Sequence, residues 1–262
     1  MDQMGRPVLL KGNPKRIVSL VPSQTELLHD IGLDEEVVGI TRFCVHPEKW
    51  FRSKTRVGGT KKLNLDKIRQ LAPDLIIGNK EENTQEEIEL LSKEFPVWMS
   101  DIRTLNEALL MIESVGMITG KPAAAEALAA SIEESFRTLA RKIHAGSGTT
   151  LYLVWYDPIM AAGGDTFIAE MLSRCGLQNV VADKARYPEI DRDLLARLNP
   201  RTILLASEPW PFNRKQADEI GLLSPSSRVL LVDGEMFSWY GSRLLKAVPY
   251  FEKVIEQIQA GC

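Results

Sequence analysis

A cysteine and a histidine two residues apart, in the stretch TRFCVHP (41–47), are the side chains best suited to hold a metal. Thiolate sulfur and imidazole nitrogen are ligands for iron, cobalt and zinc. On a β-strand, residues i and i+2 point to the same side, so Cys44 and His46 could act together there. Two ligands do not complete a metal site, and the other histidines, His29 and His144, lie in helical contexts. His46 is therefore better suited to be an axial ligand of a bound metal-bearing molecule; the plain alternative is a buried thiol beside a loop histidine.

Motifs that mark common enzyme classes do not occur in the sequence. There is no GxSxG nucleophile elbow, no phosphate-binding GxxxxGK[ST], no zinc-protease HExxH and no dinucleotide-binding GxGxxG. Carboxylates are plentiful, but the spacing marks no pair as a tuned acid and base. We therefore predict a binding protein without catalytic residues and without an intrinsic cofactor.

The composition is that of an ordinary globular chain. It has 262 residues, 44% hydrophobic and 26% charged, which is enough for one large domain or two lobes. A net charge of -3 gives no reason to expect a nucleic-acid partner, which usually needs a basic stripe. No apolar run approaches the roughly 20 residues of a membrane span. Three widely spaced cysteines form no CxxC pair, which excludes a disulfide scaffold or a zinc finger.

Aromatic side chains are concentrated in segments that follow predicted strands, although aromatics make up only 7% of the sequence. The carboxyl ends of parallel strands are where α/β proteins bind ligands. A single loop aromatic usually packs against its own lobe, but this many together suit a large, flat ligand held with little polar readout. The candidate ligand contacts from these segments are Phe43, Tyr187, Trp210, Phe237 and Trp239.

Aliphatic runs alternate with helical patterns along the chain, and these elements must position the candidate residues. The predicted strands cover residues 16–21, 37–41, 74–78, 96–100, 150–156, 179–181, 202–207 and 228–234. Nearly continuous aliphatic strands between helices indicate parallel sheets that are covered on both faces.

One stretch occurs twice in similar form. NLDKIRQLAPDLII (64–77) is echoed by RDLLARLNPRTILL (192–205), each with an Asp, a Pro seven residues later and an aliphatic run. Asp66 and Asp193 open the two helical stretches. The repeat predicts two similar α/β lobes that arose by duplication.

The segment between the repeats predicts a stiff connection. From Pro122, which suits the first turn of a helix, to His144 no further Gly or Pro occurs. A helix over these 23 residues would be roughly 35 Å long. The predicted fold is α/β, with two lobes, each a mainly parallel sheet flanked by helices, joined by one long helix. We expect an N-terminal lobe at 1–103, a connecting helical segment at 104–146 and a C-terminal lobe at 147–262.

Over essentially its whole length, the sequence resembles the substrate-binding proteins of ABC importers that have a helical backbone between their lobes. This group handles cobalamin, haem and iron-siderophores, and its fold is the class III periplasmic binding protein fold. The resemblance is closest to the cobalamin-binding members, and it rests on the order of four segments. They are DQMGRPVLLKGNPKRIVSLVPSQTELL, VGGTKKLNLDKIRQLAPDLIIGNKEEN, YPEIDRDLLARLNP and DGEMFSWYGSRLL.

The resemblance implies a membrane partner. In this family each lobe carries an exposed acidic residue at the start of a surface helix, and both residues dock into arginine pockets of a membrane permease. Asp66 and Asp193 match these positions, where family members usually have Glu. Each Asp also has a structural explanation, because an acid in the first turn stabilises a helix by roughly 0.3–1 kcal/mol. The symmetric placement, one Asp per lobe, favours docking and suits a permease dimer with two equivalent sites. We expect the binding protein itself to be a monomer.

The resemblance also implies a ligand class. Phe43 and Tyr187 keep aromatic character where cobalamin-binding members contact the corrin, and Glu235 matches an acidic position near the ligand. Thr60 and Asn79 stand where those proteins have tryptophans. We expect a substrate-binding component that captures a metal-bearing macrocycle or chelate between two lobes and delivers it to a permease. A corrinoid is favoured over haem or a ferric siderophore.

Two further alternatives concern the functional class of the protein and its cellular location. Metal-chelatase enzymes use related two-lobed architectures, so a cytoplasmic chelatase-like enzyme or cofactor chaperone is the competing class. The first residues lack the apolar core of a signal peptide. We expect a periplasmic or cell-envelope protein if a leader precedes this sequence, and a cytoplasmic one otherwise.

Overall fold

The structure, a computed structural model, describes residues 1–143 and 148–260, and its contacts divide the chain into two compact units. Unit 1 comprises Met1–Ile102, Asn106–Ile132 and Tyr240–Arg243. Unit 2 comprises Arg103–Leu105, Glu133–Trp239 and Leu244–Cys262. The expected connecting segment, 104–146, is thus shared between the two units.

Unit 1 is built on a sheet of five parallel strands in the order β3-β2-β1-β6-β7. Its strands are β1 (Ile17–Ser19), β2 (Val37–Ile40), β3 (Thr55–Arg56), β6 (Leu75–Asn79) and β7 (Val97–Ser100). A short antiparallel pair, β4 (Gly58–Gly59) and β5 (Lys62–Leu63), precedes the third helix. The helices are α1 (Pro22–Asp30), α2 (Glu48–Ser53), α3 (Leu65–Leu71), α4 (Gln85–Ser92) and α5 (Leu105–Thr119). Strands β1 and β6 are buried along their whole length, as expected for the centre of a covered sheet.

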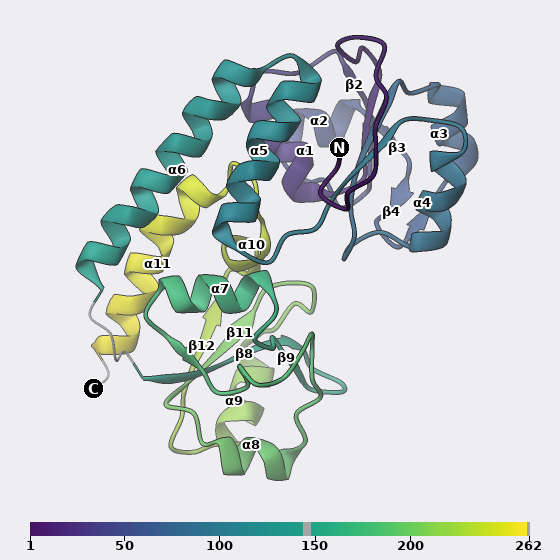
Figure 1. Cartoon of the computed structure of the whole chain (residues 1–262). Helices are drawn as coiled ribbons and strands as arrows, with labels where there is room; N and C mark the ends of the chain where they lie inside the picture. Colours follow the sequence, from purple (N-terminus) through teal and green to yellow (C-terminus); the bar gives the residue numbers. More distant parts are fainter. Residues whose placement is uncertain (144–147, 261–262) are drawn as a thin grey trace. The chain divides into compact units, whose positions relative to one another are not determined.

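Unit 2 repeats this plan. Its parallel sheet has the order β10-β8-β11-β12, and the short β9 pairs with β8 in the antiparallel sense. The strands are β8 (Thr149–Trp155), β9 (Met160–Ala161), β10 (Gln178–Asn179), β11 (Thr202–Ala206) and β12 (Arg228–Val232). The helices are α7 (Phe167–Arg174), α8 (Arg192–Leu198), α9 (Arg214–Leu223), α10 (Gly234–Ser238) and α11 (Leu244–Gln259). Within this unit, α7 lies over one face of the sheet and α8 and α9 over the other (Figure 1).

Four strands of each sheet have the same order. The order β2-β1-β6-β7 of unit 1 corresponds to β10-β8-β11-β12 of unit 2, whereas β3 and β9 have no counterpart in the other unit. Helices α3 and α8 correspond as well: both have seven residues, with Asp as the second. The side chains of Asn64 and Asp191 cap their N-termini, and Ala72 and Asn199 end them in the left-handed conformation. The sequence repeat therefore reflects a repeat in structure.

Helix α6 (Pro122–Lys142) runs from unit 1 into unit 2 without a break. Its 21 residues span roughly 32 Å at 1.5 Å per residue. One long helix therefore joins the lobes, as predicted. It ends at Lys142, whereas the predicted end, His144, lies outside the described residues. No helix in the described part of the chain combines the length and apolar character needed to cross a membrane.

A short return segment, Tyr240–Arg243, belongs to unit 1 although the residues on either side belong to unit 2. Arg243 donates two hydrogen bonds to the carboxylate of Glu26 in α1, at 2.8 and 2.9 Å, and both side chains are buried. The hydroxyl of Tyr240 donates to Glu82 at 2.9 Å. These contacts hold the return segment in unit 1, a connection that the sequence did not predict.

The buried pair gives a test of the return segment. Glu26→Ala should lower the free energy of unfolding by about 3–5 kcal/mol, because it removes the carboxylate that accepts two hydrogen bonds from the buried Arg243 guanidinium. Urea denaturation measures the change. The control, Glu48→Ala, removes an exposed ion pair with Arg52 and should cost less than about 1 kcal/mol. Equal, small losses in both variants would contradict this account of the segment.

Candidate functional site

The loop after β2 presents an aromatic side chain in unit 1. Phe43 is 48% exposed, and the Arg42 guanidinium lies 4.9 Å from the centre of its ring. The ring also rests on Gly59, where a Cβ atom would come within 3.1 Å of it. Phe43 and the neighbouring Val45, 39% exposed, give this loop an apolar surface that the unit does not cover.

Cys44 and His46 do not lie side by side on one face of a strand, as the sequence analysis considered. Strand β2 ends at Ile40, so both residues lie in the loop; Cys44 is fully buried and His46 is half-buried. Burial raises the pKa of the Cys44 thiol to about 11, although Thr25 and Thr41 hydrogen-bond the sulfur at 3.1 Å each. The thiol stays protonated at neutral pH, whereas a metal requires the thiolate. Within the described residues, no cluster of three or more His, Cys, Asp or Glu side chains could hold a metal.

Asn79, at the end of β6, shapes a turn. Its side-chain oxygen accepts from the backbone N–H groups of Glu81 and Glu82 at 2.8 and 3.1 Å, and its amide nitrogen donates to Ser100 Oγ at 2.9 Å. The residue is only 2% exposed. The polar atoms of this side chain are therefore used in hydrogen bonds within the unit, and the side chain offers no surface on which a ligand could stack.

In unit 2, aromatic rings cluster after β8 and β11. The ring of Trp210 lies 5.1 Å from that of Trp155 and 6.1 Å from that of Tyr156. Phe212 packs edge-on against Tyr156 at 6.1 Å. Trp210 and Tyr156 are half-buried, so the cluster keeps part of its surface open. Trp210 is thus placed as the sequence analysis expected for a residue at the carboxyl end of a strand.

Phe237 lies in the core of unit 2. It is fully buried, and its ring lies 5.1 Å from that of Tyr152 and 4.7 Å from that of Phe251. The expectation that its ring contacts a ligand does not fit this burial. Trp239 is also largely buried, at 6% exposed, and its indole N–H donates a hydrogen bond to the carboxylate of Glu208 in the same unit.

Tyr187 and Glu235 are both half-buried and belong to different loops of unit 2. Tyr187 lies between β10 and α8, with the Arg186 guanidinium 5.8 Å from the centre of its ring. Glu235 is in the first turn of α10, and its backbone N–H is capped by Asp233 at 3.1 Å. The structure thus places the half-buried Tyr187, Trp210 and Glu235 in unit 2 and the exposed Phe43 in unit 1.

Glu208 is a residue that sequence reasoning missed. It stands two positions after β11, and its Oε1 atom accepts hydrogen bonds from Trp239 Nε1 at 2.7 Å and Ser238 Oγ at 3.0 Å. Burial raises the pKa of this carboxyl, and the hydrogen bonds offset part of the effect. The signal available in the sequence was an acid directly after a buried strand, in SEPWPF (207–212).

The two candidate docking residues occupy equivalent positions with different surroundings. Asp66 is exposed over 85% of its side chain, and it pairs with Arg69 at 3.0 Å; Arg69 also pairs with Glu94 at 2.8 Å. Arg69 lowers the pKa of Glu94. Asp193 is exposed, and it makes no ion pair with any described residue.

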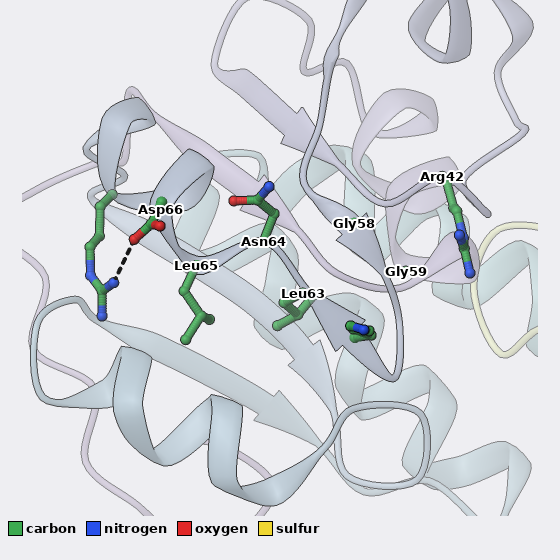
Figure 2. Close-up of a pocket in the computed structure, with 9 residues that line it drawn as sticks. Arg42, Gly58, Gly59, Leu63, Asn64, Leu65 and Asp66 are labelled. Carbon is green, nitrogen blue, oxygen red and sulfur yellow. Dashed lines mark hydrogen bonds and ion pairs between the residues drawn. The ribbon is translucent and has the colours of Figure 1, made fainter.

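A hollow lies beside each of the helices α3 and α8. The hollow beside α3 has a volume of about 510 Å³. Figure 2 shows its lining residues, among them Asp66, whose carboxylate accepts a hydrogen bond from Arg69. The one beside α8 is about 750 Å³. Their charged linings are opposite. The first has the basic residues Arg42, Lys62 and Arg69 with the acid Asp66, and the second has the acids Asp157, Glu189, Asp191 and Glu219 with the basic Arg192.

Comparison with known proteins gives the family. The sequence model of the periplasmic binding protein family matches residues 17–221, so the chain belongs to that family. This is a family of binding proteins, in line with the prediction of a binder over an enzyme.

Three similar proteins align over most of the chain. An uncharacterized ABC transporter substrate-binding lipoprotein, YvrC, of Bacillus subtilis (strain 168) is 27% identical and covers 98% of this chain and 84% of its own. A vitamin B12-binding protein of Pectobacterium carotovorum subsp. carotovorum (strain PC1) is 24% identical, with coverages of 94% and 89%. The periplasmic heme-binding protein RhuT from Roseiflexus sp. RS-1 has the same fold, with a TM-score of 0.80, 22% identity and coverages of 94% and 99%.

The state of Cys44 can be tested by alkylation. In a Cys262→Ser background, iodoacetamide at pH 8 should label neither Cys44 nor Cys175 in the native protein, because both thiols are buried and burial raises the pKa of each. Both should be labelled in urea, which mass spectrometry records. Fast labelling of native Cys44 would restore it as a candidate metal ligand.

Proposed function

We propose that this chain is the substrate-binding component of an ABC importer, acting outside the cytoplasmic membrane, and that it captures a metal-bearing macrocycle for delivery to a membrane permease. The observation that carries the proposal is the alignment with a vitamin B12-binding protein over 94% of the chain. A corrinoid is the favoured ligand.

The placement of side chains in each unit supports this ligand class. Ligands of parallel α/β sheets bind at the carboxyl ends of the strands. In unit 1, Phe43 stands there with almost half of its surface exposed. In unit 2, Tyr187 and Trp210 offer partly open rings. Aromatic rings of this kind bind a large, flat ligand by burying apolar surface against it, without charged contacts.

Haem is the second candidate, because a heme-binding protein shares the fold with a TM-score of 0.80. His46 would then matter most. It is half-buried and lies three residues after Phe43 in the same loop, and imidazole is a common axial ligand of haem iron. The same role is open to His46 toward the cobalt of a corrinoid.

Ligand contact predicts a defined loss on truncation. Phe43→Ala and Tyr187→Ala should each weaken binding of cyanocobalamin by roughly 1–3 kcal/mol, because each removes a ring that would be buried against the macrocycle. Tryptophan quenching measures the affinity. The matched control is Phe51→Ala in α2, a phenylalanine that also carries an arginine, Arg56, over its ring at 4.5 Å.

The control should bind as the unaltered protein does. His46→Ala should change the visible spectrum of bound hydroxocobalamin or haemin if His46 reaches the metal. Equal affinities in the Phe43, Tyr187 and Phe51 variants would remove the first two residues from the site, and an unchanged spectrum would remove His46 as a ligand.

We further propose that Asp66 and Asp193 dock the protein onto the permease through basic side chains of that partner. Both aspartates are exposed at the second position of equivalent helices. Their surroundings make the two contacts unequal. Arg69 already pairs with Asp66 and adds positive charge beside it, whereas Asp193 makes no ion pair with any described residue. Asp193 should therefore contribute more to docking than Asp66.

Docking can be measured with ligand affinity held constant. Asp193→Ala should reduce permease binding more than Asp66→Ala, and the double variant should lose more than either, because exposed ion pairs are individually weak, at about 0–1 kcal/mol. Arg69→Ala should strengthen binding by freeing Asp66. Permease in lipid nanodiscs and surface plasmon resonance give the affinities.

Glu133→Ala, which removes an exposed acid of α6 that pairs with Arg137, serves as the control for lost charge. Undiminished permease binding by the double variant would rule out the docking role.

A further inference from the structure

We propose that Glu208 selects among macrocyclic ligands in unit 2: it accepts a hydrogen bond from ligands that carry N–H donors, such as the peripheral amides of a corrinoid, and repels ligands that carry carboxylates, such as haem. This inference rests on the proposed function and refines its ligand class. It follows from four observations on Glu208 and its neighbours.

The first observation is that the described residues donate to only one oxygen of the carboxylate. Trp239 Nε1 at 2.7 Å and Ser238 Oγ at 3.0 Å both donate to Oε1. No described residue donates to Oε2, and no described Lys or Arg pairs with Glu208. A carboxylate that is half satisfied keeps an acceptor for a further donor.

The second observation is that this carboxylate is held in one place. Both of its donors come from the end of α10, whose start is fixed by the bond from Gly234 N to Ser207 Oγ at 2.9 Å. Gly234 also packs directly on Glu208, since a Cβ there would lie 2.8 Å from its Cγ. Phe237 anchors the same helix in the core of the unit. A pre-positioned acceptor costs little further ordering when a ligand binds.

The third observation is the surrounding charge. Burial is the main cause that raises the pKa of Glu208, and the carboxylates of Glu235 and Asp233 raise it further. An ionised Glu208 therefore lowers the stability of the unliganded unit, a cost that a stabilising residue would not carry. Donors on a ligand would offset that cost, whereas a ligand carboxylate would add a further negative charge to this group.

The fourth observation is position. Glu208 follows β11 by two residues and precedes Trp210, so it stands at the carboxyl end of a central strand of the sheet. Ligands of parallel sheets bind at that edge. A purely structural Glu208 would need only an acceptor for Trp239 and Ser238, which the side-chain oxygen of glutamine supplies equally well.

The substitution Glu208→Gln separates these roles. Its oxygen can still accept from Trp239 and Ser238, while an NH₂ group replaces the free Oε2 and turns an acceptor into a donor. Unaltered protein and E208Q are titrated with cyanocobalamin, which bears amides, and with haemin, which bears carboxylates. We expect E208Q to bind cyanocobalamin about 10-fold more weakly, as for the loss of a hydrogen bond to a charged group, and to bind haemin unchanged or more tightly.

Two controls accompany the titrations. Glu170→Gln, on α7, removes a negative charge from unit 2 whose described partner is Arg174 and not Glu208, and it should leave both affinities unchanged. Thermal unfolding at pH 7 should show E208Q to be at least as stable as the unaltered protein, because the amide carries no charge to desolvate.

The outcomes are distinct. A shift of the cobalamin-to-haemin preference in E208Q, absent in Glu170→Gln, supports the selection role. The same preference in E208Q and unaltered protein overturns it and leaves the proposed function standing. Failure of the unaltered protein to bind either probe overturns the macrocycle class and the selection role together.

Discussion

Parallel pairing of the strands is the constraint on which the rest of the structure depends. Each crossover returns the chain along a helix, so the carboxyl ends of the strands and the N-termini of the helices meet at one edge of each sheet. The two hollows follow from this. One is lined by Arg42, just after β2, and by the start of α3; the other by Tyr156, just after β8, and by residues at the start of α8. The same edge of each unit therefore carries both the candidate ligand loops and the candidate docking helix.

The architecture could be predicted from the sequence because each strand and helix is determined largely by residues within or next to it. Buried parallel strands are almost wholly aliphatic, as in DLII and TILL, and an Asp–Pro frame brackets each of the helices α3 and α8. A run without Gly or Pro after Pro122 gave the length of α6 to within its last turn. The repeat was visible because it preserves the residues that begin and end these helices, and such residues act within one or two turns of where they stand.

The details of the candidate site could not be predicted because they depend on partners distant in sequence. Whether Phe237 faces solvent or the core is decided by Tyr152 and Phe251, and nothing near residue 237 shows this. Cys44 lies in a loop after the end of β2, so the alternation of inward and outward side chains along a strand does not decide its burial. Glu208 acquires its environment from Trp239 and Ser238, some thirty residues away. Sequence patterns report periodicity, whereas these features arise from tertiary contacts.

The return segment has a consequence for how the chain is made. Unit 1 is discontinuous: most of it precedes residue 133, but Arg243, which pairs with its buried acid Glu26, follows almost all of unit 2 in the chain. During synthesis from the N-terminus, the first sheet therefore emerges from the ribosome well before Arg243, and almost all of unit 2 is translated in between. The chain of unit 1 is thus complete only after the end of α10, just before α11 completes unit 2. Each unit therefore needs a segment that is made after most of the other unit.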